Sequence, residues 1–120
     1  MNGESIAVEV TELVDPHAII RFKNEKVLEW EEWTGSKLLR SLDRLLNAKS
    51  ARRPSLKEGP YDEYIVLIHT DEPMLPYERA EELLNGVTFS GVGSIDRAFL
   101  LISYDPRVGY CPYLALQVNA

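Results

Sequence analysis

Cysteine and histidine are nearly absent from this 120-residue chain, which contains one Cys and two His. A single cysteine forms no internal disulfide and excludes a multi-cysteine zinc site, which favours a reducing compartment. No apolar run of about 18 residues occurs, so we expect no transmembrane helix. The N-terminus lacks the basic and apolar segments of a signal peptide. We therefore expect a cytoplasmic protein, prokaryotic in style, without a membrane partner.

Several common catalytic motifs are also missing. The sequence has no phosphate-binding glycine loop, no G-x-S-x-G elbow and no H-E-x-x-H. A surplus of positive charge is missing as well, because the net charge is −6, which argues against a general nucleic-acid binder. Basic residues nevertheless gather within residues 34–58. A nucleic-acid-binding loop therefore stays open as one alternative, with Lys49, Arg52, Arg53 and Lys57 as its candidate residues.

The remaining composition is typical of a globular protein, with 45% hydrophobic and 27% charged residues. The length suits a single domain that covers residues 1–120. Residues 5–14 alternate with a period of two, which predicts a strand. Its two faces carry different side chains: Ile6, Val8 and Val10 on one, and Ala7, Glu9 and Thr11 on the other.

Five more strands and two helices are predicted from the rest of the chain. Residues 18–23 and 26–30 form a hairpin, residues 63–69 and 97–103 are central strands covered on both faces, and residues 113–118 are a last strand antiparallel to 97–103. Leucines at helical spacing predict a helix that Thr34 or Ser36 caps and that ends near Lys49, before a loop. A second, short helix covers residues 76–85.

The order of elements is therefore β-β-β-α-β-α-β-β. Helices that alternate with apolar strands favour an α/β (α+β) fold with one mixed central sheet of about five or six strands. Cys111, which has no catalytic partner nearby in the sequence, is expected to be buried and structural.

The first candidate site is the acidic strand, where Glu9, Thr11 and Glu12 are candidate catalytic residues. Glu9 could give Mg²⁺ one carboxylate, but alternate residues of a strand lie nearly 7 Å apart, so a second ligand must come from elsewhere. Two alternatives stay open. Glu9 lies on a solvated face of the strand, or it pairs with a basic side chain.

The second candidate site is the sequence His69-Thr70-Asp71-Glu72, which ends a buried strand. Functional groups often follow the carboxyl ends of strands in α/β sheets. Asp71 and Glu72 are therefore candidate metal ligands together with Glu9. The alternative is that Thr70 and Asp71 only organise the turn that follows.

The strand with VEVTEL, a helix, and a strand ending in IHTDE resemble, in this order, the second half of the restriction-endonuclease-like fold, the PD-(D/E)XK nuclease superfamily. The resemblance implies Mg²⁺-dependent phosphodiester cleavage, in which an Asp and the Glu of E-x-K hold the metal and the Lys supports the attacking water. Glu9 matches that Glu, and Thr11 stands at the Lys position. Thr11 carries no charge to neutralise a transition state. We expect no room for the upstream strand that carries the Asp, because Glu9 is only eight residues from Met1.

The resemblance and its departures lead to one main interpretation. We expect a non-catalytic binding or assembly module derived from this fold, which forms a homodimer through an exposed sheet edge at the N-terminus. The sequence establishes no cofactor, and Mg²⁺ is expected only if the chain is a nuclease. The alternative is a Mg²⁺-dependent nuclease that a partner chain or non-standard carboxylates complete. The sequence identifies no substrate or ligand.

Overall fold

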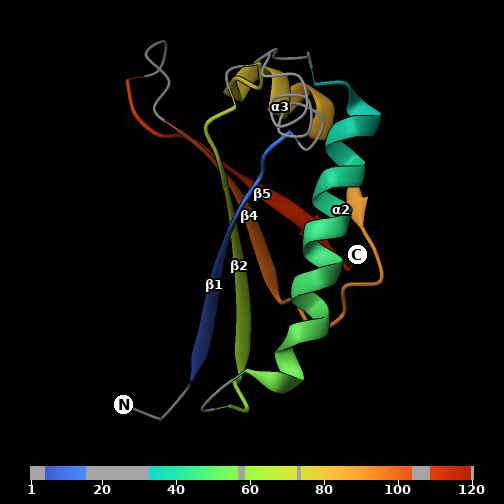
Figure 1. The fold of residues 1–120 in the computed structure, drawn as a ribbon, viewed down its shortest axis with the longest axis vertical. Helices are drawn as coiled ribbons and strands as arrows, with labels where there is room; N and C mark the ends of the chain where they lie inside the picture. The colour runs from blue at the N-terminus through green and yellow to red at the C-terminus, as the bar shows by residue number, and fades with distance from the viewer. Residues whose placement is uncertain (1–4, 16–32, 57–58, 73, 104–108, 120) are drawn as a thin grey trace, which may run out of the picture.

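The computed structural model describes residues 5–15, 33–56, 59–72, 74–103 and 109–119, which form one five-stranded sheet and the elements that pack on it (Figure 1). Along the chain these are β1 (Ile6–Glu12), α2 (Gly35–Arg52), the 3₁₀ turn η1 (Arg53–Ser55), β2 (Glu63–Thr70), α3 (Tyr77–Leu84), β3 (Thr88–Phe89), β4 (Arg97–Ile102) and β5 (Tyr113–Val118). The predicted α/β fold with one mixed sheet and two helices is confirmed. No helix of these ranges is long and apolar enough to cross a bilayer.

The sheet has the strand order β1-β2-β4-β5-β3, so β1 and β3 are its two edges in the described chain. β1, β2 and β4 run parallel, β5 is antiparallel to β4, and β3 is parallel to β5. The central position of β2 and β4 and the antiparallel pairing of β4 with β5 are confirmed. β3 is a strand that the sequence did not predict, because two residues are too short to show a period.

The helix α2 packs along one face of the sheet. Thr34 caps its N-terminus, where its Oγ1 accepts from the backbone N–H of Lys37 at 3.2 Å. The leucine stripe points into the core and is completed by alternate residues of the strands beneath it. Fully buried examples are Leu38, Leu42 and Leu46 on the helix and Val66, Ile68 and Leu100 on the sheet.

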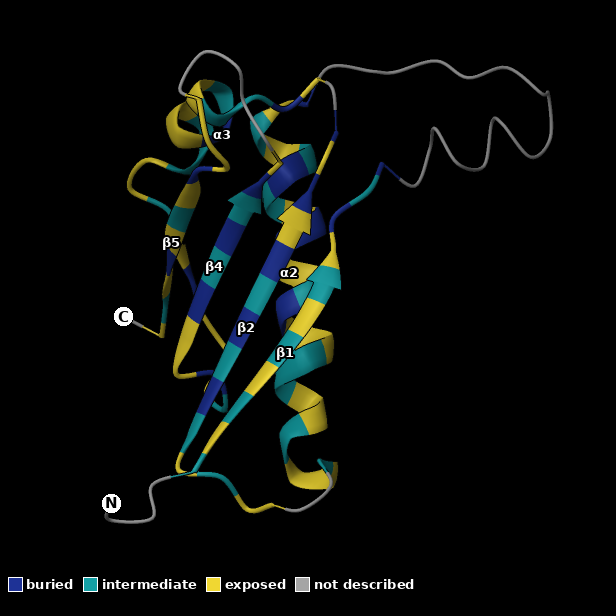
Figure 2. Cartoon of the chain, turned by 90° about the vertical axis from the view of Figure 1, so that its left-hand side faces the viewer, coloured by how far each residue is buried: buried dark blue, intermediate teal, exposed yellow. Residues whose placement is uncertain are grey.

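The other face of the sheet has no helix on it among the described residues (Figure 2). Ile6, Val8 and Val10 of β1 point to this side and are 47%, 53% and 59% exposed. Glu9 and Thr11 point to the covered side instead. The interpretation of Glu9 as part of a solvated face is therefore wrong, because α2 covers the polar side of β1 and leaves its apolar side open.

Three further predictions need correction, and a fourth falls outside the described ranges. The first helix does not end near Lys49 but continues to Arg52 and into η1, where Pro54 lies in the first turn and is tolerated. The central strands are not covered on both faces, because Ile65 and Leu67 of β2 remain partly exposed. Cys111 is exposed rather than buried. The hairpin predicted at 18–30 lies outside the described residues.

Candidate functional site

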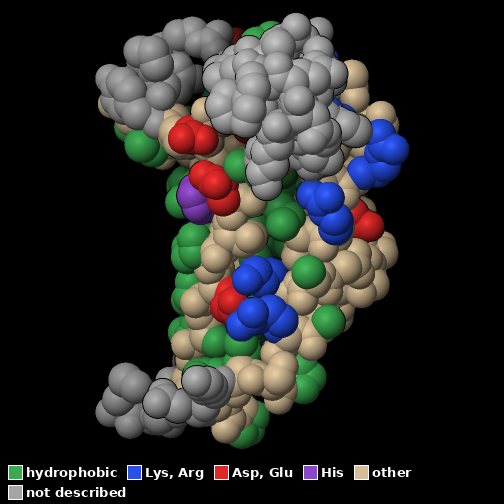
Figure 3. Space-filling view, in the orientation of Figure 1, with side chains coloured by type: hydrophobic (Ala, Val, Ile, Leu, Met, Phe, Trp, Pro, Cys, Tyr) green, Lys and Arg blue, Asp and Glu red, His purple; other side chains and the backbone are tan. Residues whose placement is uncertain are grey.

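The side chain of Glu9 lies between β1 and the C-terminal half of α2 and is 18% exposed. Its Oε2 accepts from Lys49 Nζ at 3.1 Å, and its Oε1 accepts from Arg52 Nε at 3.2 Å. The Tyr64 hydroxyl of β2 donates to the same Oε1 at 3.3 Å. On the face of the molecule shown in Figure 3, basic side chains gather beside acidic ones midway along its length. We call Glu9, Lys49, Arg52 and Tyr64 together the Glu9 cluster.

The elements explain why these groups meet. Lys49 and Arg52 are three residues apart and so lie on the same side of the helix. Glu9 and Tyr64 lie on neighbouring strands and both point toward α2. The sequence alternative that pairs Glu9 with a basic side chain is therefore correct. Lys49 and Arg52 could be identified as the partners of Glu9 only once the parallel pairing of β1 with β2 was known. That pairing decides which turn of α2 lies opposite Glu9.

The charges of the cluster hold Glu9 in its ionised form. Burial alone raises the pKa of Glu9, but the hydrogen bond and charge of Lys49, the charge of Arg52 and the Tyr64 hydrogen bond outweigh burial and lower the pKa below its ordinary 4.5. Burial and the negative charge of Glu9 raise the pKa of Tyr64 to about 12. Glu9 is thus a carboxylate held by two cations and a neutral hydroxyl.

The other basic candidates are engaged by the protein itself. Arg53 Nη1 donates to the Ser94 carbonyl at 2.6 Å and to Asp96 Oδ2 at 3.0 Å, and its Nη2 donates to the Tyr61 carbonyl at 2.8 Å. Arg52 remains 58% exposed despite its contact with Glu9. Lys57 lies outside the described residues. The three described candidates, Lys49, Arg52 and Arg53, therefore already pair with acidic groups of the fold, and Arg52 is the one with most of its side chain exposed to a phosphate.

Thr11 and Glu12 do not join the Glu9 cluster. Thr11 points to the covered side of the sheet one alternation beyond Glu9 and is paired in register with Ile68. Glu12 is exposed on the opposite face, next to His69 of β2. The three candidate catalytic residues are therefore divided between both faces of the sheet.

Asp71 and Glu72 are also separated from Glu9. Glu9 is in register with Val66, and Asp71 lies five residues farther along the same chain, which at about 3.3 Å per residue is roughly 16 Å. One Mg²⁺ ion cannot bridge that distance, since its ligands lie at about 2.1 Å. No group of three or more His, Cys, Asp or Glu side chains in the described ranges could hold a metal ion. The predicted metal set of Glu9, Asp71 and Glu72 is therefore not assembled in this chain.

Glu72 instead belongs to a buried polar group at the end of β1 and β2. Lys37 Nζ donates to Asp15 Oδ2 at 2.5 Å and lies 4.6 Å from the centre of the Trp33 ring. Burial and the charge of Asp15 raise the pKa of Glu72, while hydrogen bonds from the Asp15 backbone and from Trp33 and the charge of Lys37 act in the opposite direction. The Thr70 hydroxyl donates to the Leu13 carbonyl at 2.9 Å and so ties the two strand ends together.

This buried group has a structural role that the sequence did not reveal. Asp15 directly precedes a proline in the sequence, a position typical of a turn, yet it is 1% exposed. Its contact with Lys37 joins the end of β1 to the first turn of α2. Because the two residues are 22 apart in the sequence, no local pattern links them. The one local signal is that Asp15 directly precedes a proline, and this pair indicates a turn as readily as a buried ion pair.

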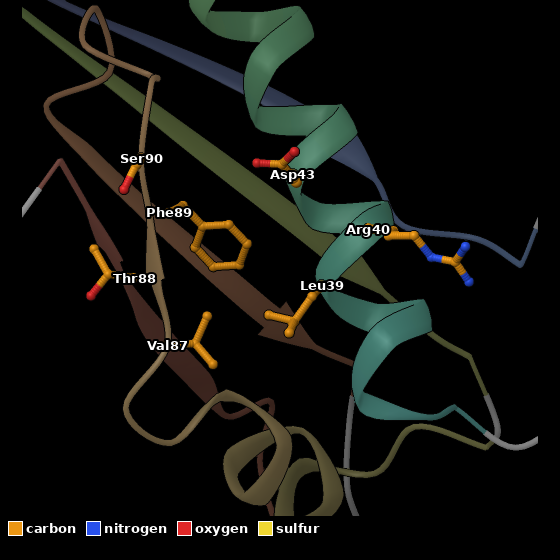
Figure 4. A pocket seen from close by; sticks show the side chains of 7 residues that line it. All are labelled: Leu39, Arg40, Asp43, Val87, Thr88, Phe89 and Ser90. Carbon is orange, nitrogen blue, oxygen red and sulfur yellow. The ribbon is translucent and has the colours of Figure 1, made fainter.

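A separate cavity of about 410 Å³ lies between α2 and β3 (Figure 4). Leu39 and Phe89 point toward each other across it, and Asp43 is directed over it from α2. Val87, Thr88, Ser90 and Arg40 complete its lining. The cavity is large enough for a small ligand, but its polar groups do not converge on one point as they do in most specific sites.

No protein-family model, curated protein or solved structure matches this chain.

Proposed function

We propose that this chain is a binding or assembly module without catalytic activity of its own, and that it works as a homodimer. The observation that carries the proposal is the open apolar face of the sheet. Aliphatic side chains of β1 are about half exposed there, and Tyr113 of β5 is 63% exposed. Exposed apolar patches that span several strands are typical of interaction surfaces.

The state of Glu9 supports the non-catalytic part of the proposal. A metal ion at Glu9 would compete with Lys49 and Arg52, which already neutralise the carboxylate. The nucleases that the sequence resembles also hold the metal with a second carboxylate, from an Asp, and Mg²⁺ in proteins is held by one or two carboxylates together with substrate phosphates. Among the described residues, the side chains that act on the pKa of Glu9 are Lys49, Arg52 and Tyr64, and none of them is a carboxylate. The Glu9 cluster therefore acts as a link that fastens α2 to β1.

Cleavage assays test this proposal. Purified protein is incubated with single- and double-stranded DNA and RNA in Mg²⁺, Mn²⁺ or Ca²⁺, beside the variant Glu9→Gln. We expect no cleavage above the level of the variant. Metal-dependent cleavage that disappears in Glu9→Gln would overturn the proposal.

One observation favours a second candidate, the Mg²⁺-dependent nuclease that a partner completes. The sequence has Thr11 where the resembling nucleases have Lys, but the structure brings Lys49 from α2 to 3.1 Å from Glu9. β1 is an edge strand of the described sheet, so a strand from a partner could pair with it. Adjacent side chains on paired strands lie about 5 Å apart. A carboxylate on such a strand would therefore stand next to Glu9 on the covered side.

The second candidate predicts a particular response to mutation. Once the partner is present, Lys49→Met and Glu9→Gln should each abolish cleavage, while Arg44→Met, an exposed basic residue of the same helix, should leave it unchanged. Activity that survives Lys49→Met would exclude Lys49 as the substitute for the missing lysine.

A further inference from the structure

The open face of the sheet is a continuous surface made by β1, β2, β4 and β5. The pairing registers place side chains that point the same way side by side: Val10, Leu67, Phe99 and Ala115 form one row, and Glu12, His69, Leu101 and Tyr113 form the next. Toward the other end, Val8 and Ile65 lie beside Arg97. We call this surface the open face.

The centre of the open face is apolar and its ends are polar. Phe99 and Tyr113 pack edge to face, with ring centroids 6.0 Å apart. At one end Arg97 Nε donates to Glu63 Oε1 at 2.6 Å, and at the other Glu12 lies beside His69. An apolar centre with a polar rim is the usual anatomy of a protein interface.

We propose that a second copy of this chain packs its own open face against this one, sheet on sheet. The inference rests on the proposed function, since it names the partner of the assembly module. Stacked sheets lie about 10 Å apart with interdigitated side chains, which is how two sheets form a common core. Tyr113 projects from its sheet, whereas Ala115 beside it is small. The face thus offers both a protruding ring and a shallow position that can receive one.

The size of the open face suits a dimer of moderate affinity. Four strands about 4.8 Å apart and six residues of about 3.3 Å each cover roughly 400 Å² in projection. The accessible area of the face is larger than its projection, because side chains make the surface uneven. Two copies together should therefore bury on the order of 1,000 to 1,200 Å², which is at the lower end for specific interfaces. We therefore expect a micromolar dimer rather than an obligate one.

The charge of the open face permits contact between identical copies. The chain carries −6 in total. Among the described residues of the face, Glu12 and Glu63 are acidic and Arg97 is basic, which gives −1 with His69 neutral. Most of the negative charge therefore lies elsewhere, and two open faces meet with little repulsion.

Sedimentation velocity on the full chain tests the inference over a range of roughly 5 to 500 µM, which brackets a micromolar dissociation constant. The test variant is Tyr113→Ser, and the matched control is Tyr110→Ser, because Tyr110 is 60% exposed and does not belong to the open face. We expect a concentration-dependent dimer for the wild type and for Tyr110→Ser. Tyr113→Ser should weaken dimerisation at least tenfold.

A second pair of variants separates face-to-face packing from pairing through the β1 edge. Val10→Lys places a charge on the open face, and Ala48→Lys places one on the exposed side of α2. Face-to-face packing requires Val10→Lys and Tyr113→Ser each to weaken dimerisation at least tenfold, with Ala48→Lys as dimeric as the wild type. A dimer that only Val10→Lys disrupts indicates edge pairing and overturns the inference, because Tyr113 lies three strands away from β1.

A wild-type monomer at every concentration also overturns the inference. That result would also remove the homodimer from the proposed function, but it would leave the non-catalytic binding module standing, because the open face could then bind a different protein. Metal-dependent cleavage lost in Glu9→Gln would instead overturn the proposed function whatever the oligomeric state.

Discussion

Glu9 shows at the scale of one residue how a polar side chain on a strand can become part of the core. Its carboxylate is mostly buried, yet it keeps its charge because two cations and a hydroxyl surround it. Removing Glu9 leaves Lys49, which is 16% exposed, largely buried without compensation, whereas Arg52 can turn to solvent. The position of Glu9 on the covered face, beside Lys49 and Arg52, makes its negative charge part of what holds the fold together.

Replacing Glu9 with Gln should therefore destabilise the fold. The substitution keeps the size of the side chain but leaves the charges of Lys49 and Arg52 uncompensated. We expect a loss of about 1–2 kcal/mol in the free energy of unfolding at pH 7, between the values for exposed and buried ion pairs. Urea titration measures it, with Glu12→Gln, an exposed acid of the same strand, as the control within about 0.5 kcal/mol of the wild type.

The effect of Glu9→Gln should depend on pH. A carboxyl with a lowered folded-state pKa contributes stability above its ordinary value of 4.5, and this is lost as the pH falls through the folded-state pKa. The difference between variant and wild type should thus shrink on acidification toward pH 3. A difference that stays constant would show that charge is not the cause.

Glu72 should behave in the opposite way. Its pKa is raised by burial and by Asp15, so the folded state favours the protonated form. That contribution is complete below its ordinary pKa of 4.5 and is lost as the pH rises through the raised folded-state value. Glu72→Gln should remove this part of the pH dependence and become more stable, relative to the wild type, as the pH rises from 4.5 to neutral.

Stability curves of the wild type and Glu72→Gln between pH 4 and 8 give the measurement. Asp71→Asn, an exposed neighbour, serves as the control and should follow the wild type. Parallel curves for the wild type and Glu72→Gln would contradict the proposed effect of burial.

At the scale of elements, the pattern of α2 was predictable and that of β1 was not. Leucines three and four residues apart define one side of a helix without ambiguity, and a threonine before it is a known cap. β1 has two faces that alternate equally well. Which face is covered depends on α2, which is far away in the sequence, and the apolar face of Ile6, Val8 and Val10 is the one left open.

The cap of α2 gives a prediction at this scale. Thr34→Ala removes the side-chain acceptor for the backbone N–H of Lys37 and should cost about 1 kcal/mol of stability. Ser36→Ala is the matched control, since Ser36 lies inside the helix and Thr34 accepts that N–H. Thermal or urea unfolding distinguishes the two. Equal losses would show that the cap contact contributes nothing specific.

At the scale of the whole molecule, the sequence was sufficient for the class of fold and insufficient for its sites. A strand or a helix shows itself in the pattern of neighbouring residues, as an apolar run or as apolar residues at helical spacing. The elements, and with them the class of fold, can therefore be predicted from short stretches of sequence. The Glu9 cluster and the Asp15–Lys37 contact join residues 40 and 22 positions apart. Their geometry follows from the register of β1 against β2, which no local pattern specifies.

The pairing of β1 with β2 also affects the order in which parts of the chain are expected to fold. β1 is hydrogen-bonded only to β2 in the described sheet, and the contacts at its start and end join residues more than fifty positions apart, as in Ser5 with Asp62 and Leu13 with His69. Closing so long a loop costs entropy before any contact rewards it, and parallel pairing therefore forms slowly. We therefore expect β1 to join the sheet after β2 and β4 have paired. On this view Glu9 reaches Lys49 and Arg52 late in folding, and we expect the C-terminal end of α2 to be fixed last.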